Sequence, residues 1–333
     1  MRAAAALTPA RVSRILGWQV AAPLIGSRPT SFPFISGDTF RALAGLIVET
    51  HPNPVAAPRT VNRIRLGGHP AGRQVLFASA SVFEPEIAAQ VPGAPAVAEI
   101  AEYLRFIARL PTLAGWRIIV HNGDRIPDDE ALCALAAASD GVLCVNAPDG
   151  LPGVVPIPIG LENLWWRGNG LLGDFTGPGG LPAEDPLPPA ERDVEVVASF
   201  RVGTNPAVRT PLAALVARSR HRPLTFARGP AEFHRLLRRA LFVLSPRGNG
   251  PDCHRTWEAV YLGAVPVVEP GTLPLSLTRE LPILVSGWAE FLDHDERTLR
   301  ATYAEITTRS AAGAYAPYWI ELVGRRSLRE AGR

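Results

Sequence analysis

The sequence predicts an α/β protein built from two tandem domains. Short apolar runs alternate with helical patterns along most of the 333 residues, which is typical of βαβ units and parallel sheets. A stretch dense in Gly and Pro, residues 168–190, divides the chain into two halves of similar size. This length allows two domains at roughly 100–200 residues each. We therefore expect domains at residues 1–185 and 186–333, with the last helix free to pack back on the first domain.

In the first half, strands are predicted for five apolar runs, residues 32–35, 75–80, 116–120, 141–145 and 154–159. Apolar positions at helical spacing predict a helix over residues 96–110. Pro127 followed by three acidic residues predicts another helix over residues 127–139, because Pro and acidic side chains favour the first turn of a helix. Residues 168–190 are too rich in Gly and Pro for a helix or strand, so we expect a linker or long loop.

In the second half, strands are predicted at residues 194–200, 241–244, 265–268 and 283–285. Helices are predicted at residues 206–219, 230–240 and 252–262 and in the tail from residue 296. Asp252 is a suitable N-cap for the helix over 252–262, and Gly263 is suited to end it. The default ligand site of two such α/β domains is the cleft between them.

All 34 basic residues of the chain are Arg, and Lys is absent. P-loop, protein-kinase and Schiff-base chemistry are therefore excluded, because each needs a Lys. A bound phosphate must be held by Arg, backbone N–H groups or hydroxyls. The net charge of +3 gives little reason to expect a nucleic-acid partner. Residues 1–185 carry 14 Arg against 16 acidic residues (−2) and residues 186–333 carry 20 against 15 (+5), so we expect an anionic ligand in the second half.

Cysteine usage and hydropathy indicate where the protein resides. The three Cys residues have no metal-binding spacing and no plausible disulfide framework, which suits a reducing compartment. The apolar run near the N-terminus, residues 15–26, is 12 residues long and too short to span a bilayer. We expect a cytoplasmic protein with at most peripheral contact with the inner face of the membrane.

The strongest local feature is a strand that runs into a Gly-rich loop and then a helix, over residues 241–258. Gly248 and Gly250 allow tight turning and close approach of a ligand, and free N–H groups at the helix start attract phosphate. Arg247 and Arg255 each offer a planar fork to a diphosphate. Glu258, further along the helix, can accept hydrogen bonds from sugar hydroxyls.

A dinucleotide fingerprint is the competing interpretation of this loop. The sequence gives G-x-G-x-x-C, with Cys253 at the third glycine position, and Glu269 ends the next strand near the place of a ribose-binding acid. The alternative function is then an NAD(P)-dependent oxidoreductase using the Gly248/Gly250 loop. Against it, the motif lies in the second half of the chain, whereas such fingerprints usually open their domain.

Three segments resemble the central block of exostosin-like glycosyltransferases: Ser245-Pro-Arg-Gly, Arg255-Thr-Trp-Glu258-Ala and Gly263-Ala-Val-Pro266-Val-Val. The clear similarity covers residues 241–270, and weaker similarity reaches residues 200–209 and 156–163. The resemblance implies a GT-B fold, in which two Rossmann-like domains with parallel sheets face each other across a cleft. The nucleotide-sugar donor would bind the C-terminal domain and the acceptor the N-terminal domain.

By this resemblance the protein would transfer a sugar from a nucleoside-diphosphate donor to a glycan or lipid-linked acceptor, as a soluble bacterial relative in surface polysaccharide biosynthesis. The donor-binding residues would be Thr204, Asn205, Arg209, Ser245, Arg247, Gly248, Asn249, Gly250, Arg255 and Glu258. We expect neither metal nor cofactor, because Asp293-His294-Asp295 matches a D-x-D string but lies away from any predicted strand end. A nucleotide-sugar-binding module without activity stays open as a further alternative.

An acceptor hydroxyl needs a base if the mechanism inverts the anomeric centre. Asp38 and His121 follow predicted strands of the first half, where α/β sites gather, and are our first and second candidates for the catalytic base. Glu162, which follows a predicted strand and Gly160, is the third. Arg41 and Asp124 are further candidates on the acceptor side. Asp38 is also a plausible helix cap, His121 a plausible buried loop histidine, and Asp124 a plausible cap of the following helix.

Overall fold

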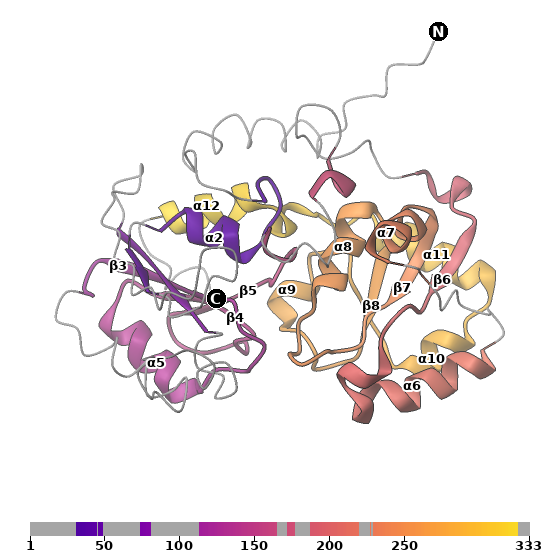
Figure 1. The fold of residues 1–333 in the computed structure, drawn as a ribbon, viewed down its shortest axis with the longest axis horizontal. Helices are drawn as coiled ribbons and strands as arrows, with labels where there is room; N and C mark the ends of the chain where they lie inside the picture. The colour runs from indigo at the N-terminus through magenta and orange to yellow at the C-terminus, as the bar shows by residue number, and fades with distance from the viewer. Residues whose placement is uncertain are drawn as a thin grey trace, which may run out of the picture.

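The computed structural model describes residues 31–44, 46–48, 74–80, 113–164, 172–176, 187–219, 227 and 229–325. The strands in these ranges form two parallel sheets with helices packed on them, which confirms the predicted α/β class (Figure 1). The first sheet has five strands in the order β1-β2-β3-β4-β5, and the second has four in the order β6-β7-β8-β9. Every strand pair within these sheets is parallel.

The first sheet comprises β1 (Leu46–Val48), β2 (Gln74–Ser79), β3 (Trp116–His121), β4 (Val142–Val145) and β5 (Val154–Ile157). Successive side chains of its strands point to opposite faces of the sheet and so pack in different apolar layers. Ile118 packs with the helix α5 (Asp129–Ala138), whereas Ile119 packs with α2 (Gly37–Ala42) and α12 (Ala316–Gly324). Figure 1 shows α5 and α12 on opposite sides of this sheet.

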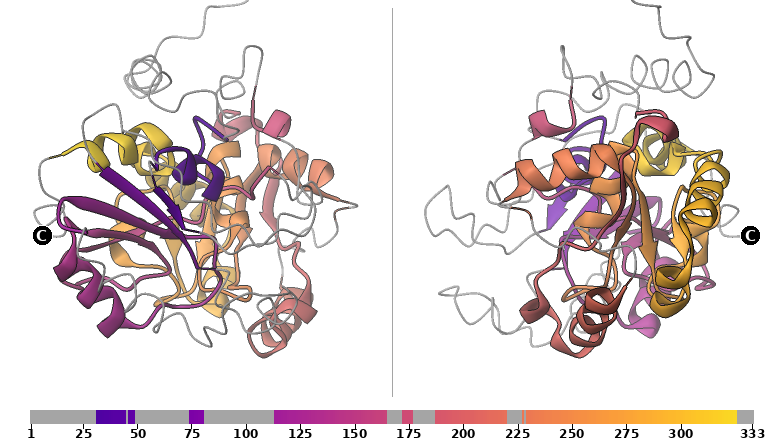
Figure 2. Two further views of the ribbon diagram at one scale, coloured as in Figure 1. Left: turned by 60° about the vertical axis from the view of Figure 1, so that its left-hand side comes forward. Right: turned by 90° about the vertical axis from the view of Figure 1, so that its right-hand side faces the viewer.

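The second sheet comprises β6 (Val194–Val197), β7 (Ala240–Leu244), β8 (Val265–Val268) and β9 (Leu284–Val285). On one face lie α7 (Pro230–Arg239) and α8 (His254–Leu262), and on the other lie α6 (Pro206–Arg218), α10 (Trp288–Asp293) and α11 (Glu296–Ile306). The short helix α9 (Leu275–Thr278) joins β8 to β9. The right-hand view of Figure 2 shows α7 and the C-terminal helices on opposite sides of the sheet.

The last helix, α12, follows the second sheet in sequence but lies against the first (Figure 2). Its backbone is joined to the first half where Ala316 N–H donates to the Pro33 carbonyl at 3.0 Å. The fully buried guanidinium of Arg117, on β3, donates to the carbonyls of Leu322, at 3.1 Å, and Val323. A cation at the carboxyl end of a helix is favoured by the helix dipole. The two halves therefore share one apolar layer that contains α2, α8 and α12.

Most predicted elements are present, with small differences at their ends. The strand predicted at residues 194–200 ends at Val197, and the helix predicted at residues 127–139 begins at Asp129. Asp128, not Asp124, caps that helix by accepting a hydrogen bond from Ala131 N–H at 2.7 Å. The helix predicted over residues 96–110 lies outside the described residues.

Two expectations need correction. Residues 32–35 form no strand of either sheet: Phe34 makes one antiparallel bridge to Tyr315, and Ser36 makes one parallel bridge to Leu161. The chain turns into α2 directly afterwards, because the Ser36 hydroxyl caps that helix. The described part of the Gly/Pro-rich stretch also contains two 3₁₀ helices, Leu172–Asp174 and Pro189–Glu191. A 3₁₀ turn of three residues tolerates such composition because it needs few backbone hydrogen bonds.

Candidate functional site

The loop between β7 and α8, residues 245–253, meets the loops that follow strands of the first sheet. Asp252 N–H donates to Asn146 Oδ1 at 3.2 Å, and Ile159 N–H donates to Asp252 Oδ2 at 2.8 Å. Asn146 and Ile159 follow β4 and β5, so the carboxyl ends of strands from both sheets meet at this place. We call it the junction. In α/β proteins the carboxyl ends of parallel strands are where ligand sites form.

Gly250 lets the β7–α8 loop lie directly on the first half. A Cβ atom on Gly250 would lie 2.5 Å from the backbone oxygen of Asp124, which is closer than any side chain permits. The adjacent Asn249 donates from Nδ2 to Asp124 Oδ2 at 3.1 Å. Gly250 thus allows a close approach of protein backbone, whereas the sequence alone led us to expect the close approach of a ligand.

Arg209, predicted to bind the donor, holds together the loop that carries the predicted site. Its guanidinium donates to the carbonyls of Arg201 at 2.9 Å, Arg247 at 3.0 Å and Pro246 at 3.1 Å. The side chain is buried, and burial followed by the nearby charge of Arg255 lowers the pKa of Arg209. Three of the five N–H donors of the guanidinium are thus used within the protein, which shows a structural role for Arg209, and its donor-binding role stays a prediction.

Three other predicted residues also shape this loop. Asn205 caps α6 and donates from Nδ2 to the Gly248 carbonyl at 2.9 Å. The exposed Thr204 lies beside Gly248, since a Cβ there would be 3.8 Å from Thr204 Cγ2. Ser245 is buried, and its hydroxyl lies 2.8 Å from that of Thr256. The structure brings these residues together, and Asn205 and Ser245 are already satisfied by protein groups.

The first turn of α8 carries positive charge and free backbone donors. Cys253 is its N-cap and makes no capping hydrogen bond, and no described residue accepts from the N–H groups of His254 and Arg255. Arg247 and Arg255 are partly exposed, and no carboxylate of the described residues forms an ion pair with them. Among the described residues, the buried Nε atoms of both also find no hydrogen-bond partner. This arrangement is suited to an anion.

Glu258 lies one turn further along α8 and is 8% exposed. Within the described residues its carboxylate has no hydrogen bond, and its nearest cation is the imidazole of His234, with Nε2 3.8 Å from Oε1. His234 Nδ1 in turn lies 2.8 Å from Asp174 Oδ2. Burial by itself lowers the pKa of His234, but the two carboxylates more than offset it and raise that pKa. The predicted acceptor of sugar hydroxyls is thus oriented by a buried histidine.

A second polar cluster lies on the first half, at the start of α2. Asp38 Oδ2 accepts from Leu164 N–H at 2.8 Å, and Asp38 N–H donates to Asn163 Oδ1 at 2.8 Å. Asn163 also donates from Nδ2 to Asn122 Oδ1 at 3.2 Å, and its N–H donates to Glu162 Oε1 at 2.9 Å. Asp38 and Glu162, both predicted on the acceptor side, therefore belong to one network. Arg41 lies in the last turn of α2.

His121 does not suit the role of base that we gave it. It is 1% exposed, and its ring nitrogens lie 3.1 Å from Asn122 Oδ1 and 3.2 Å from the Pro158 carbonyl. Burial lowers the pKa of His121 to about 4, so the ring is neutral at pH 7 and a weak base. This geometry fits the alternative better, which is a buried loop histidine with both ring nitrogens hydrogen-bonded.

His254 bridges the two halves, and sequence reasoning missed it. Its Nδ1 lies 2.8 Å from the Gly160 carbonyl, and its Nε2 lies 3.3 Å from Glu162 Oε2. Burial lowers the pKa of His254, but Glu162, the Gly160 carbonyl, Glu258 and Asp252 together raise it above its ordinary value. The sequence alone shows only that His254 and Glu258 are four residues apart, which places them on one face of the helix.

The predicted capping role of Asp252 is also wrong. α8 begins at His254, and the Asp252 carboxylate instead accepts hydrogen bonds from Ile159 N–H and from Trp257 Nε1, which lies 2.8 Å from Oδ1. Burial raises the pKa of Asp252 to about 6. Its carboxylate therefore fastens the start of α8 to the loop after β5.

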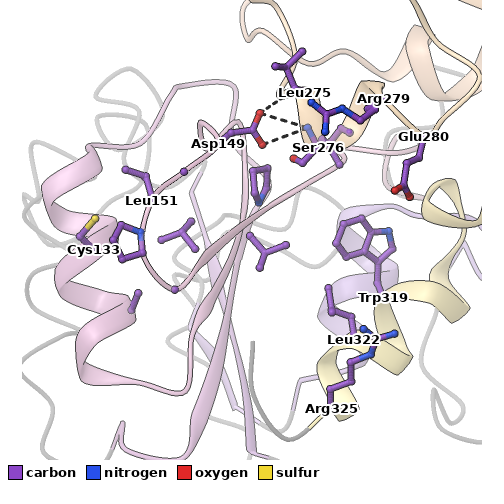
Figure 3. Close-up of a pocket in the computed structure, with 18 of the residues that line it drawn as sticks. Cys133, Asp149, Leu151, Leu275, Ser276, Arg279, Glu280, Trp319, Leu322 and Arg325 are labelled. Carbon is purple, nitrogen blue, oxygen red and sulfur yellow. Dashed lines mark hydrogen bonds between the residues drawn. The ribbon is translucent and has the colours of Figure 1, made fainter. Parts of the chain in front are cut away.

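A separate cavity of about 920 Å³ lies between α5, the start of β5, α9 and α12 (Figure 3). Leu151, Leu275, Arg279 and Trp319 are among its lining residues. Asp149 spans one side by accepting hydrogen bonds from the first N–H groups of α9, as the dashed lines in Figure 3 show. None of the predicted site residues lines this cavity.

No helix among the described residues has the length and apolar character needed to cross a membrane. Comparison with protein-family models gives no match to the chain, and comparison with curated proteins gives none of significance. The resemblance to exostosin-like glycosyltransferases therefore rests on the sequence segments themselves.

Proposed function

We propose that the protein is a glycosyltransferase that moves a sugar from a nucleoside-diphosphate donor to a glycan or lipid-linked acceptor. One observation carries this proposal. Arg247 and Arg255 have no carboxylate partner among the described residues, and they flank an uncapped helix start at the junction of two parallel sheets. Such a site is built for a diphosphate and lies where an acceptor bound to the first half can reach it.

The positive charge of this site suits the chemistry of glycosyl transfer. The bond between the anomeric carbon and the diphosphate breaks, and the leaving oxygen gains negative charge. Arginines and oriented N–H groups stabilise that charge without a metal ion if they are in place before the reaction. The buried carboxylate of Glu258, one turn from Arg255, has free lone pairs for hydroxyls of the donor.

The overall arrangement supports a GT-B organisation. The carboxyl ends of two parallel sheets meet, the proposed donor groups come from the second sheet, and Asp38 and Glu162 come from the first. The sequence resemblance over residues 241–270 points to the same organisation. We further propose a cytoplasmic role in surface polysaccharide synthesis, with at most peripheral membrane contact.

The oxidoreductase alternative is less well supported. In a dinucleotide fingerprint the second glycine lets the backbone approach the pyrophosphate. Here Gly250 holds that position, and the space for its side chain is taken by Asp124 of the first half. Glu269 does follow β8, as the alternative requires. A binding module without activity shares the same donor site and differs from our proposal only in turnover.

A thermal-shift panel tests the proposal. UDP, GDP, ADP and their common sugar conjugates are each added to the protein, with NAD and NADP in parallel. We expect one nucleoside diphosphate and its sugar to raise the melting temperature, because a ligand that binds only the folded state stabilises it. Stabilisation by NAD or NADP alone would favour the oxidoreductase. Binding of a sugar nucleotide without release of its sugar to water or to any acceptor would favour the binding module.

Variants then locate the site. We expect Arg247→Ala and Glu258→Ala each to weaken binding of that sugar nucleotide by more than about tenfold, the loss of a charge-assisted hydrogen bond. Arg300→Ala is the matched control, because Arg300 pairs with Glu296, four residues earlier on α11, and belongs to no part of the proposed donor site. Unchanged affinity in both site variants, measured by calorimetry, would remove the proposed donor site.

A further inference from the structure

We infer that Glu162 is the catalytic base of the proposed transfer and that His254 is the positioning residue that holds its carboxylate. This inference rests on the proposed function. The geometry that carries it is a contact across the junction, between Glu162 Oε2 after β5 and His254 Nε2 in the first turn of α8, at 3.3 Å.

Glu162 is better placed than His121, which is fully buried and neutral. Asp38 accepts from Leu164 N–H and Asp124 from Asn249, whereas Glu162 faces α8 across the junction. Glu162 contacts the helix turn whose N–H groups and Arg255 form the proposed diphosphate site. The Glu162 side chain is 18% exposed, so it is held by protein yet open to an acceptor hydroxyl.

The hydrogen bonds fix the protonation of the pair. A backbone carbonyl only accepts, so His254 Nδ1, 2.8 Å from the Gly160 carbonyl, must carry a proton. The Nε2 atom faces a carboxylate, which favours a second proton there and hence an imidazolium. Each carboxylate oxygen of Glu162 then accepts one bond, Oε2 from His254 and Oε1 from Asn163 N–H at 2.9 Å.

The proposed step balances as follows. The acceptor hydroxyl gives its proton to the carboxylate of Glu162, and its oxygen forms a bond to the anomeric carbon of the donor. The bond from that carbon to the diphosphate oxygen breaks, and the electron pair leaves with the nucleoside diphosphate toward Arg247 and Arg255. His254 keeps both protons throughout, so it orients the base and is not consumed.

The surroundings of His254 make its charge depend on pH in one direction. Its ring faces the carboxylates of Glu162, Glu258 and Asp252 and the neutral ring of His121. The charged form is therefore favoured, and it is lost as pH rises through the elevated pKa of His254. Positioning of Glu162 should fail on the alkaline side.

The test uses the full chain and whichever of UDP-glucose, UDP-N-acetylglucosamine, GDP-mannose or ADP-glucose raises the melting temperature most, with water as acceptor. Glu162→Gln keeps the shape of the side chain and cannot take a proton. We expect its rate of nucleoside-diphosphate release to fall by about 10²–10⁴-fold, the range for loss of a general base, with the dissociation constant of the donor unchanged. Glu290→Gln, at an exposed position of α10, is the control and should keep the wild-type rate.

His254 gives the second readout. His254→Gln keeps an amide N–H donor that does not titrate, so its rate should no longer fall as the pH becomes alkaline, as that of the wild type does. His254→Ala removes the donor and should be slower than His254→Gln. By NMR, the pKa of the His254 ring should fall in Glu162→Gln. A wild-type rate in Glu162→Gln with normal donor binding would overturn the inference and leave the proposed function standing. If no sugar nucleotide binds the wild type, the proposed function fails and the inference fails with it.

Discussion

Asp252 and Arg209 illustrate how the role of a polar residue is decided. Both are buried side chains with partners inside the protein: Asp252 accepts from Ile159 N–H, 93 positions away, and from Trp257 Nε1, and Arg209 donates to three carbonyls. From sequence, Asp252 is a helix cap and Arg209 a residue that binds the sugar-nucleotide donor. A buried polar group must be hydrogen-bonded, and the polar groups that the fold places beside it determine its partners.

His121 yields a prediction at this scale. Burial lowers its pKa to about 4 in the folded protein, against about 6.5 when unfolded. The unfolded chain therefore binds more protons between these values, so this contribution to stability is present above about pH 6.5 and is lost as pH falls toward 4. We expect the stability difference between wild type and His121→Gln to shrink by about 2–3 kcal/mol between pH 7.5 and pH 4.5. Urea denaturation at both pH values measures it, and a difference independent of pH would contradict it.

At the scale of elements, the β7–α8 unit was well predicted from sequence. An apolar run predicts β7, and Gly248 and Gly250 predict the loop that follows it. The next helix ends at Gly263, which has a left-handed φ of 78°. These are local effects of composition and backbone conformation. The reason for Gly250 was not local, because its neighbour is the backbone of Asp124 in the other half.

Gly250 and Gly248 form a matched pair for a test. A Cβ on Gly250 would lie 2.5 Å from a backbone oxygen, whereas one on Gly248 meets nothing closer than 3.4 Å, and neither residue has a left-handed φ. We expect Gly250→Ala to lower the free energy of unfolding by about 1–3 kcal/mol, the usual effect of overpacking. Gly248→Ala should change it by less than about 0.5 kcal/mol, as substitutions away from such contacts do. Equal effects in chemical denaturation would refute the packing argument.

At the scale of the whole molecule, α12 makes the two halves depend on each other. It follows the second sheet in the chain, yet Trp319, Ile320 and Val323 are buried in the layer that covers the first sheet. Arg117, on β3, is fully buried and takes its carbonyl partners from the end of this helix. The first half therefore obtains part of its core from the C-terminal segment.

Truncation tests this dependence. A chain that ends at Tyr315 loses α12, while a chain that ends at Arg325 keeps it. We expect the shorter chain to lose most of its stability, since each large apolar side chain that is fully buried contributes roughly 1.5–3 kcal/mol and Arg117 would be left buried without those carbonyls. Melting temperature and resistance to proteolysis are the measurements. If the chain ending at Tyr315 melts like the one ending at Arg325, α12 is dispensable and our account of the shared layer is wrong.

The sequence by itself determined the α/β class, nearly all described strands and long helices, and the grouping of Arg247, Arg255 and Glu258 after β7. Periodicity, glycine placement and helix position act between residues a few positions apart, so they can be read from the chain. The tertiary structure alone decided which polar groups face one another. Glu162 meets His254, and His254 lies against Gly160, 94 positions away, because two sheets pack with their carboxyl ends together. No local pattern encodes that meeting, because it depends on how both cores bury their apolar faces.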